Sequence, residues 1–227
     1  MRRGLPRLFP VTVRRRVRLA AVLLLGFLLA SPAAILAGGD AGQREDALAM
    51  LREAAERNSR TKTLSTDFVQ KKTLAILSMP LVSEGYMCFS READGPRLLW
   101  AYTSPAPSGF LWEKGGGALW QGGVSERRAP SAKEARLLEA VSRQILFWLS
   151  FEPESVLKAY AVEKADAAAR ELVLLPRRPA FFERVRLVFA PGMASVAELE
   201  FSGGDEATAL SFSQTAVDAP LPPRCRP

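Results

Sequence analysis

The residue types that most often carry out catalysis are scarce in this 227-residue chain. It has no histidine, which excludes Ser-His-Asp and Cys-His nucleophiles, histidine acid–base catalysis and histidine-ligated metals. Two cysteines alone are too few to hold a structural zinc ion. No paired-carboxylate motif is present either, so the sequence predicts a binding protein without a cofactor rather than an enzyme.

The two cysteines, Cys88 and Cys225, leave two alternatives open. In an oxidising compartment they can pair and tie the proline-rich C-terminal tail to a strand. Otherwise Cys88 is buried and Cys225 is unpaired in the tail. Sequence alone does not decide between them, because a disulfide requires a short Cα–Cα separation that the sequence does not contain.

The N-terminus has the organisation of a secretory signal peptide. Arginines at 14–16 and 18 precede an apolar run over 19–30, which small residues and a proline follow. We expect residues 1–37 to be the signal peptide, cleaved after Ala37, with cleavage after Ala33 as the alternative. The run is shorter than the roughly 20 residues that a membrane span needs, although an uncleaved anchor is the other interpretation. Residues 38–227 are then one domain, exported to the periplasm.

Removal of this segment changes the charge of the chain. Seven of the 31 lysines and arginines lie in residues 1–37, which contain no acidic residue. The remaining 24 basic residues equal the 24 acidic ones in number. The sequence pI of 9.8 therefore reflects the signal peptide, and nucleic acid is not an expected partner.

Hydrophobic periodicity predicts helices and strands in a simple order. Apolar residues recur at helical spacing over 43–58, and again after a capping-box pair, Ser131 and Glu134. About five strands lie between these helices and about five follow the second one. Their short, regular spacing favours an antiparallel meander. The fold class is therefore α+β, mainly β, with a curved sheet that forms an unclosed β-barrel of about ten to eleven strands under a helical lid.

Large apolar side chains on the first strands and the second helix are the candidate ligand-binding residues. Trp and Phe offer wide, rigid apolar surfaces that suit a hydrocarbon-binding cavity. The alternative interpretation is an ordinary packed core. The candidates on the strands are Phe68, Tyr86, Leu98, Trp100, Tyr102, Phe110, Trp112 and Trp120. The candidates on the helical lid are Leu137, Val141, Ile145 and Trp148.

Four short motifs follow one another along the predicted strands: Thr66–Lys71 (TDFVQK), Glu84–Tyr86 (EGY), Leu99–Pro105 (LWAYTSP) and Gly117–Trp120 (GALW). Their order and spacing resemble those of the LolA family of periplasmic carriers of outer-membrane lipoproteins. The similarity covers roughly residues 43–215. In the family an arginine precedes the tryptophan, whereas Leu99 precedes Trp100 here, so the chain resembles a divergent member.

The resemblance implies an unclosed β-barrel that shuttles lipoprotein acyl chains, as a monomer, from an inner-membrane exporter to an outer-membrane receptor. It also implies an arginine that latches the lid, for which Arg97 is the candidate. Other interpretations stay open: a lipid sensor or receptor of the same fold, an interaction module with a solid interior, or an enzyme.

Overall fold

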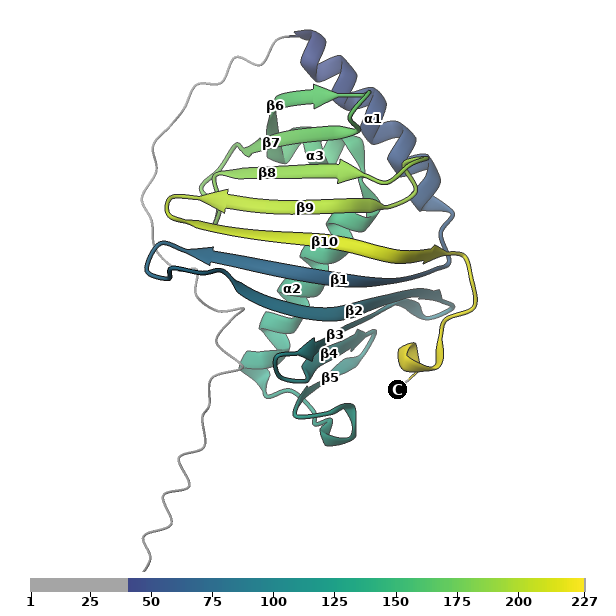
Figure 1. Cartoon of the computed structure of the whole chain (residues 1–227). Helices are drawn as coiled ribbons and strands as arrows, with labels where there is room; N and C mark the ends of the chain where they lie inside the picture. Colours follow the sequence, from purple (N-terminus) through teal and green to yellow (C-terminus); the bar gives the residue numbers. More distant parts are fainter. Residues whose placement is uncertain (1–40, 227) are drawn as a thin grey trace, which may run out of the picture.

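The computed structural model describes residues 41–226, which form one ten-stranded antiparallel sheet and three α-helices (Figure 1). The helices are α1 (Ala41–Ser59), α2 (Ala132–Ser150) and α3 (Pro153–Ala159). The strands are β1 (Thr63–Leu74), β2 (Leu81–Glu92), β3 (Gly95–Ser104), β4 (Ser108–Glu113), β5 (Gly116–Gln121), β6 (Tyr160–Asp166), β7 (Glu171–Pro176), β8 (Arg184–Phe189), β9 (Val196–Gly203) and β10 (Glu206–Val217). The predicted fold class is confirmed, and the strand number is ten. The expected signal peptide lies outside the described residues.

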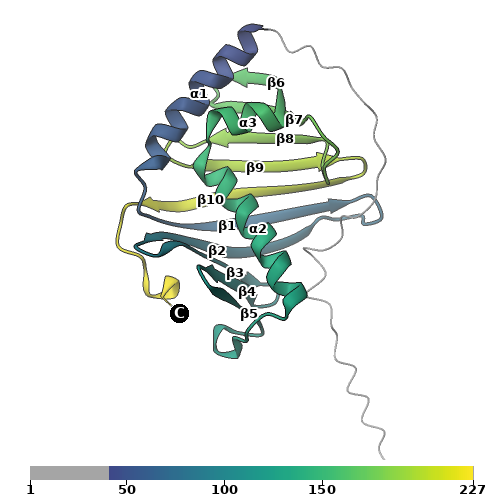
Figure 2. The ribbon, with the colours of Figure 1, turned by 180° about the vertical axis from the view of Figure 1, so that it is seen from behind.

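The strand order places the first and last strands of the chain, β1 and β10, at the centre of the sheet. The order is β5-β4-β3-β2-β1-β10-β9-β8-β7-β6, so β1 pairs with β10 and two meanders extend from this pair. Strands β5 and β6 are consecutive in sequence but lie at opposite edges, so the sheet is not closed. The chain between them, α2 and α3, crosses one face of the sheet (Figure 2). We call this face the helix face and the opposite one the outer face.

Side chains alternate between the two faces along each strand. In β3, Leu98, Trp100 and Tyr102 belong to the main apolar cluster on the helix face. Leu99 and Ala101, between them, belong to a second cluster on the outer face. Each face is therefore covered by a different part of the chain.

Helix α1 covers the edge strand β6 (Figure 1). Its Ala47, Leu51 and Ala54 are fully buried, as the narrow alanine-rich stripe predicts for a helix on the surface of the sheet. The Gln43 side-chain oxygen accepts a hydrogen bond of 2.6 Å from the backbone N–H of Ala165 in β6. An edge strand is a site of unwanted strand pairing, and α1 protects it.

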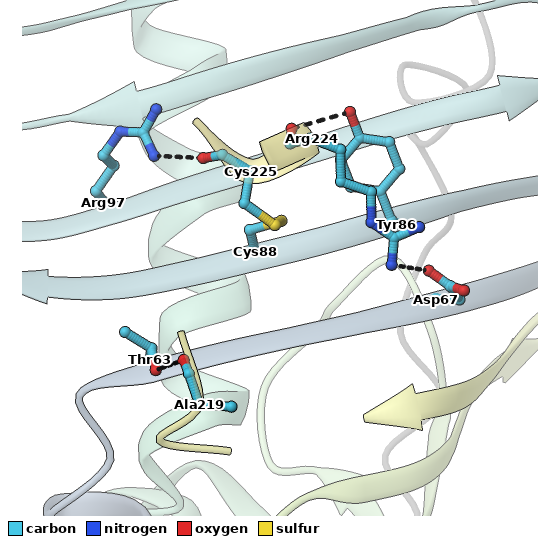
Figure 3. The surroundings of a disulfide bond; sticks show 8 residues. All are labelled: Thr63, Asp67, Tyr86, Cys88, Arg97, Ala219, Arg224 and Cys225. Carbon is cyan, nitrogen blue, oxygen red and sulfur yellow. Dashed lines mark hydrogen bonds and ion pairs between the residues drawn. A yellow bond between two sulfur atoms is a disulfide. The ribbon is translucent and has the colours of Figure 1, made fainter. Parts of the chain in front are cut away.

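The C-terminal tail packs against the outer face of β2–β5 and is covalently attached to β2 (Figure 3). Cys88 in β2 and Cys225 form a disulfide with a Cα–Cα distance of 5.7 Å. The Arg224 guanidinium pairs with Asp67 at 2.5 Å and lies over the Tyr86 ring. Of the two alternatives that the sequence left open, the structure therefore shows the one in which Cys88 and Cys225 are paired.

None of the helices within residues 41–226 is long and apolar enough to cross a membrane.

Loss of the disulfide tests its stabilising role. The two cysteines are 137 residues apart, and a cross-link over so long a loop strongly restricts the unfolded chain. We expect the double variant Cys88→Ala/Cys225→Ala to lose about 2–5 kcal/mol of unfolding free energy in urea titrations. Trp120 fluorescence should also shift to the red as the tail leaves the outer face. Equal urea midpoints for the two proteins would contradict this role.

Candidate functional site

The centre of the helix face is an aromatic cluster from β1 and β3. The Phe68 ring stacks on Trp100 with centroids 4.4 Å apart and meets Tyr102 edge-on at 5.4 Å. Gly85 on the intervening strand β2 makes this arrangement possible. A Cβ atom at Gly85 would lie 2.6 Å from the Phe68 ring and would also collide with the Ala101 carbonyl oxygen.

The cluster has a polar end on β1. The Tyr102 hydroxyl donates a hydrogen bond of 2.8 Å to the side-chain oxygen of Gln70. Burial is the main cause that raises the pKa of Tyr102, so this hydroxyl stays neutral at physiological pH. The helix face therefore offers a wide apolar surface with a neutral hydrogen-bonding group at one side.

Helix α2 lies over this face and begins at a capping box. Ser131 and Glu134 bond to each other's backbone N–H groups, as the sequence predicts. The Arg128 guanidinium donates to both oxygens of Glu134, at 2.9 and 2.6 Å. Because backbone hydrogen bonds join Arg128 to Leu119, these contacts tie the start of α2 to β5.

The first half of α2 has one further polar contact with the sheet. The Trp112 indole N–H donates to the Glu139 carboxylate at 3.3 Å. The Arg143 guanidinium also pairs with Glu139, at 2.8 Å. Beside this contact lies a cleft of about 420 Å³ between the α2 N-terminus and the hairpin turns, lined by Pro96, Trp112 and Leu138 among others.

The second half of α2 is anchored by aromatic contacts. Trp148 lies 5.4 Å from Tyr160 and 6.2 Å from Phe201, measured between ring centroids. Phe151, in the left-handed conformation at the helix end, packs against Phe189 at 5.0 Å. The C-terminal end of the helix is therefore held by aromatic packing, whereas the polar contacts at its N-terminal end are exposed.

Two polar groups of α2 are buried without a hydrogen-bond partner in the described chain. They are the Ser142 hydroxyl, on a fully buried residue, and the Trp148 indole N–H. An unpaired buried polar group costs about 1–3 kcal/mol. The arrangement in which α2 covers the helix face is therefore less stable than it would be if only apolar side chains were buried there.

The structure brings most of the candidate ligand-binding residues together on the helix face. They belong to the main cluster or pack against it, and comprise Phe68, Leu98, Trp100, Tyr102, Phe110, Trp112, Val141, Ile145 and Trp148. The innermost of them fill the space under α2 in this arrangement: Phe68 is 1% exposed and Trp100 is 7% exposed. Ligand access to these side chains therefore requires α2 to move.

Three of the candidates lie elsewhere. Tyr86 and Trp120 belong to the outer-face cluster, under the C-terminal tail. Arg97 donates to the Cys225 carbonyl at 3.0 Å and pairs with Glu113 at 3.5 Å, so it contacts the tail and not the lid (Figure 3). Tyr86 and Trp120 have the parity of the outer face because of the register between strands. Arg97 faces the same way because it directly precedes Leu98 in β3, whose side chain faces the helix.

The lid stripe differs from the prediction at its N-terminal end. Leu137 is 36% exposed, whereas Leu138 and Ser142 are buried. Ser142 could not be identified from hydrophobic spacing because its side chain is polar. The contacts of Glu139 and Arg128 with the rest of the site could not be predicted either, because charged residues on a helix surface or in a loop carry no periodic signal.

Residues 41–226 contain no group of three side chains suited to a metal ion.

No family model and no curated protein matches the chain. Similar solved structures include LprF from Mycobacterium bovis (11% identity, TM-score 0.41, 78% of this chain and 95% of that one). Others are the lipoprotein LppX from Mycobacterium tuberculosis (10%, 0.44, 78% and 98%) and a LolA superfamily protein from Nitrosomonas europaea (12%, 0.35, 78% and 96%).

The capping box provides a test of how α2 is held. Hydrogen bonds from Arg128 and Ser131 hold the pKa of Glu134 far below its ordinary value of 4.5. The ionised Glu134 carboxylate therefore stabilises the folded state fully at any pH above its ordinary pKa. This stabilisation is lost as the pH falls toward the lowered pKa. We expect Glu134→Gln to lower the melting temperature at pH 7, and the difference from wild type to shrink in strongly acidic buffer. A difference that does not change with pH would contradict the assignment.

Proposed function

We propose that the chain binds acyl chains of lipids or lipid-modified proteins between the helix face and α2, and carries them through the periplasm. The observation that supports this most strongly is the wide aromatic face covered by a single helix, with an unpaired Ser142 hydroxyl at its centre. Exposing an acyl chain to water costs about 0.8 kcal/mol per methylene group. A carrier must replace that contact with apolar surface of its own.

Movement of α2 about its C-terminal end supplies the entry route in this proposal. The aromatic anchors at Trp148 and Phe151 stay in place, while the contacts at Arg128, Glu134 and Glu139 break. An acyl chain then takes the place of α2 against Phe68 and Trp100. The neutral hydroxyl of Tyr102 lies where the polar part of a lipid would need a hydrogen-bonding group.

A periplasmic location accords with two features. The expected signal peptide would export the chain, and the Cys88–Cys225 disulfide suits an oxidising compartment. The cargo donor and acceptor, an inner-membrane exporter and an outer-membrane receptor, are those that the LolA resemblance implies. The absence of histidine from the sequence is the reason to propose binding rather than catalysis.

Two tryptophans on opposite faces of the sheet provide a matched test of the binding site. Trp100 on the helix face is 7% exposed, and Trp120 on the outer face is 3% exposed. Both Trp→Ala variants should lose about 3–5 kcal/mol of stability, because each leaves a cavity. We expect only Trp100→Ala to weaken binding of a fluorescent fatty acid by about tenfold or more, measured at a temperature where both variants are folded. Equal losses of affinity would contradict the proposed site.

Ser142 tests whether the covered arrangement competes with the ligand. Ser142→Ala removes the unpaired hydroxyl, so we expect it to raise the unfolding free energy by about 1 kcal/mol or more. Because this change stabilises the arrangement that excludes ligand, fatty-acid affinity should fall. Ser150→Ala, in the same helix but exposed, is the control and should change neither quantity by much. A less stable Ser142→Ala protein would show that the hydroxyl has a partner.

A receptor that keeps its lipid is the second candidate, because the same site serves both functions. Transfer of an acylated peptide between two vesicle populations separates them. A carrier speeds the transfer in proportion to its concentration, whereas a receptor only depletes the donor vesicles.

A further inference from the structure

The described chain exposes seven large apolar side chains, and five of them lie in the bend between β1 and β2 or at the start of β2. They are Ile76 (89% exposed), Met79 (74%), Val82 (46%), Leu77 (40%) and Leu81 (37%). We call residues 75–82 the apolar tip. Soluble monomers rarely leave so many neighbouring apolar side chains in water unless the surface has a partner.

The composition of the tip is unusual for a protein surface. No charged residue occurs from Thr73 to Ser83. The same stretch has no Tyr, Trp or Arg, the residues that dominate the binding energy of protein–protein interfaces. It consists mainly of aliphatic side chains and methionine on a projecting bend, which fits a partner that is fluid and apolar.

The tip lies on a rim of the sheet that carries another exposed apolar residue. The Ala75 N–H donates to the Asp205 carbonyl in the β9–β10 turn, and that turn lies beside the loop before β8 (Figure 1). Phe181 in this loop is 61% exposed. The rim therefore presents apolar side chains from two separate loops on one side of the sheet.

Charges of both signs surround the tip. Lys71 and Arg178 are exposed on this rim, and so are Glu183 and Asp205. Attraction to an acidic or basic surface is therefore not the main force that the tip would use. Burial of its apolar side chains is the remaining driving force.

We propose that the apolar tip inserts into the surface of a lipid bilayer and docks the protein there. A bilayer accepts a projecting apolar bend without shape complementarity, and binding strength rises with the apolar area buried. The inference does not depend on the proposed cargo site, because the tip is formed by the β1–β2 bend and the site by the interior of the sheet under α2.

Vesicle flotation tests the docking. Wild-type protein should float with phosphatidylcholine vesicles, and addition of phosphatidylglycerol should change the bound fraction little, because the rim carries both charges. We expect Ile76→Asp/Met79→Asp to lower the partition coefficient at least about tenfold. The control, Ala167→Asp/Ala168→Asp, adds the same charge to the exposed β6–β7 turn and should bind like wild type. Circular dichroism checks that both variants are folded.

A second readout locates the inserted segment. Ile76→Trp should become quenched by brominated phosphatidylcholine, beyond any quenching of the wild-type tryptophans. Fatty-acid binding by the Ile76→Asp/Met79→Asp variant should stay at the wild-type level, so failure of the docking and failure of the cargo site give different results.

Three outcomes would overturn the proposal. One is wild-type protein that does not float with either vesicle type. Another is flotation that the tip substitutions leave unchanged. The third is concentration-dependent self-association that these substitutions abolish without any vesicle binding, which would make the tip an interface between two copies of the chain.

Discussion

The pairing of β1 with β10 is the constraint on which the rest of the structure depends. It joins two five-stranded meanders at the centre of one sheet, so β5 and β6 lie at opposite edges although they are consecutive strands. Ten strands span roughly 43 Å, whereas the 19-residue α2 is about 28 Å long. The connection therefore also uses the chain on either side of α2, residues 122–131 and α3, and it crosses the helix face between the two edges (Figure 2). The helix is therefore placed over the aromatic face by topology, and its own contacts need only be moderately stable.

Because the chain topology places α2 over the sheet, the two ends of this helix can be held by different kinds of contact. Aromatic packing of Trp148 and Phe151 fixes its C-terminal end, next to α3 and β6. Its N-terminal end relies on the exposed contacts of Arg128, Glu134 and Glu139, which water can replace at small cost. The unpaired Ser142 hydroxyl lies between the two ends. A helix with these properties can cover an apolar face in the absence of ligand and still give way to a hydrocarbon chain.

The order of elements could be predicted from the sequence because it depends on local patterns. Alternation along Leu98, Trp100 and Tyr102 identified one face, and the Ser131–Glu134 pair identified the start of α2. Which face each strand shows to the helix could not be predicted, because that depends on register between strands far apart in sequence. Tyr86 and Trp120 were assigned to the wrong face for this reason. Arg97 was a lid candidate only through the family resemblance, and the alternation within β3 places it on the outer face. Predicting the Cys88–Cys225 disulfide would also have required knowledge of which distant segments lie side by side.

The most direct test of the account is photocrosslinking with a palmitic acid that carries a diazirine near the end of its chain. The cross-linked peptides are identified by mass spectrometry. We expect labels on the helix-face segments of β1 and β3 around Phe68 and Trp100, and on the inner side of α2 around Ser142. Labels confined to the β1–β2 bend or to the outer face around Trp120 would show that hydrocarbon does not enter beneath α2, and would contradict the account.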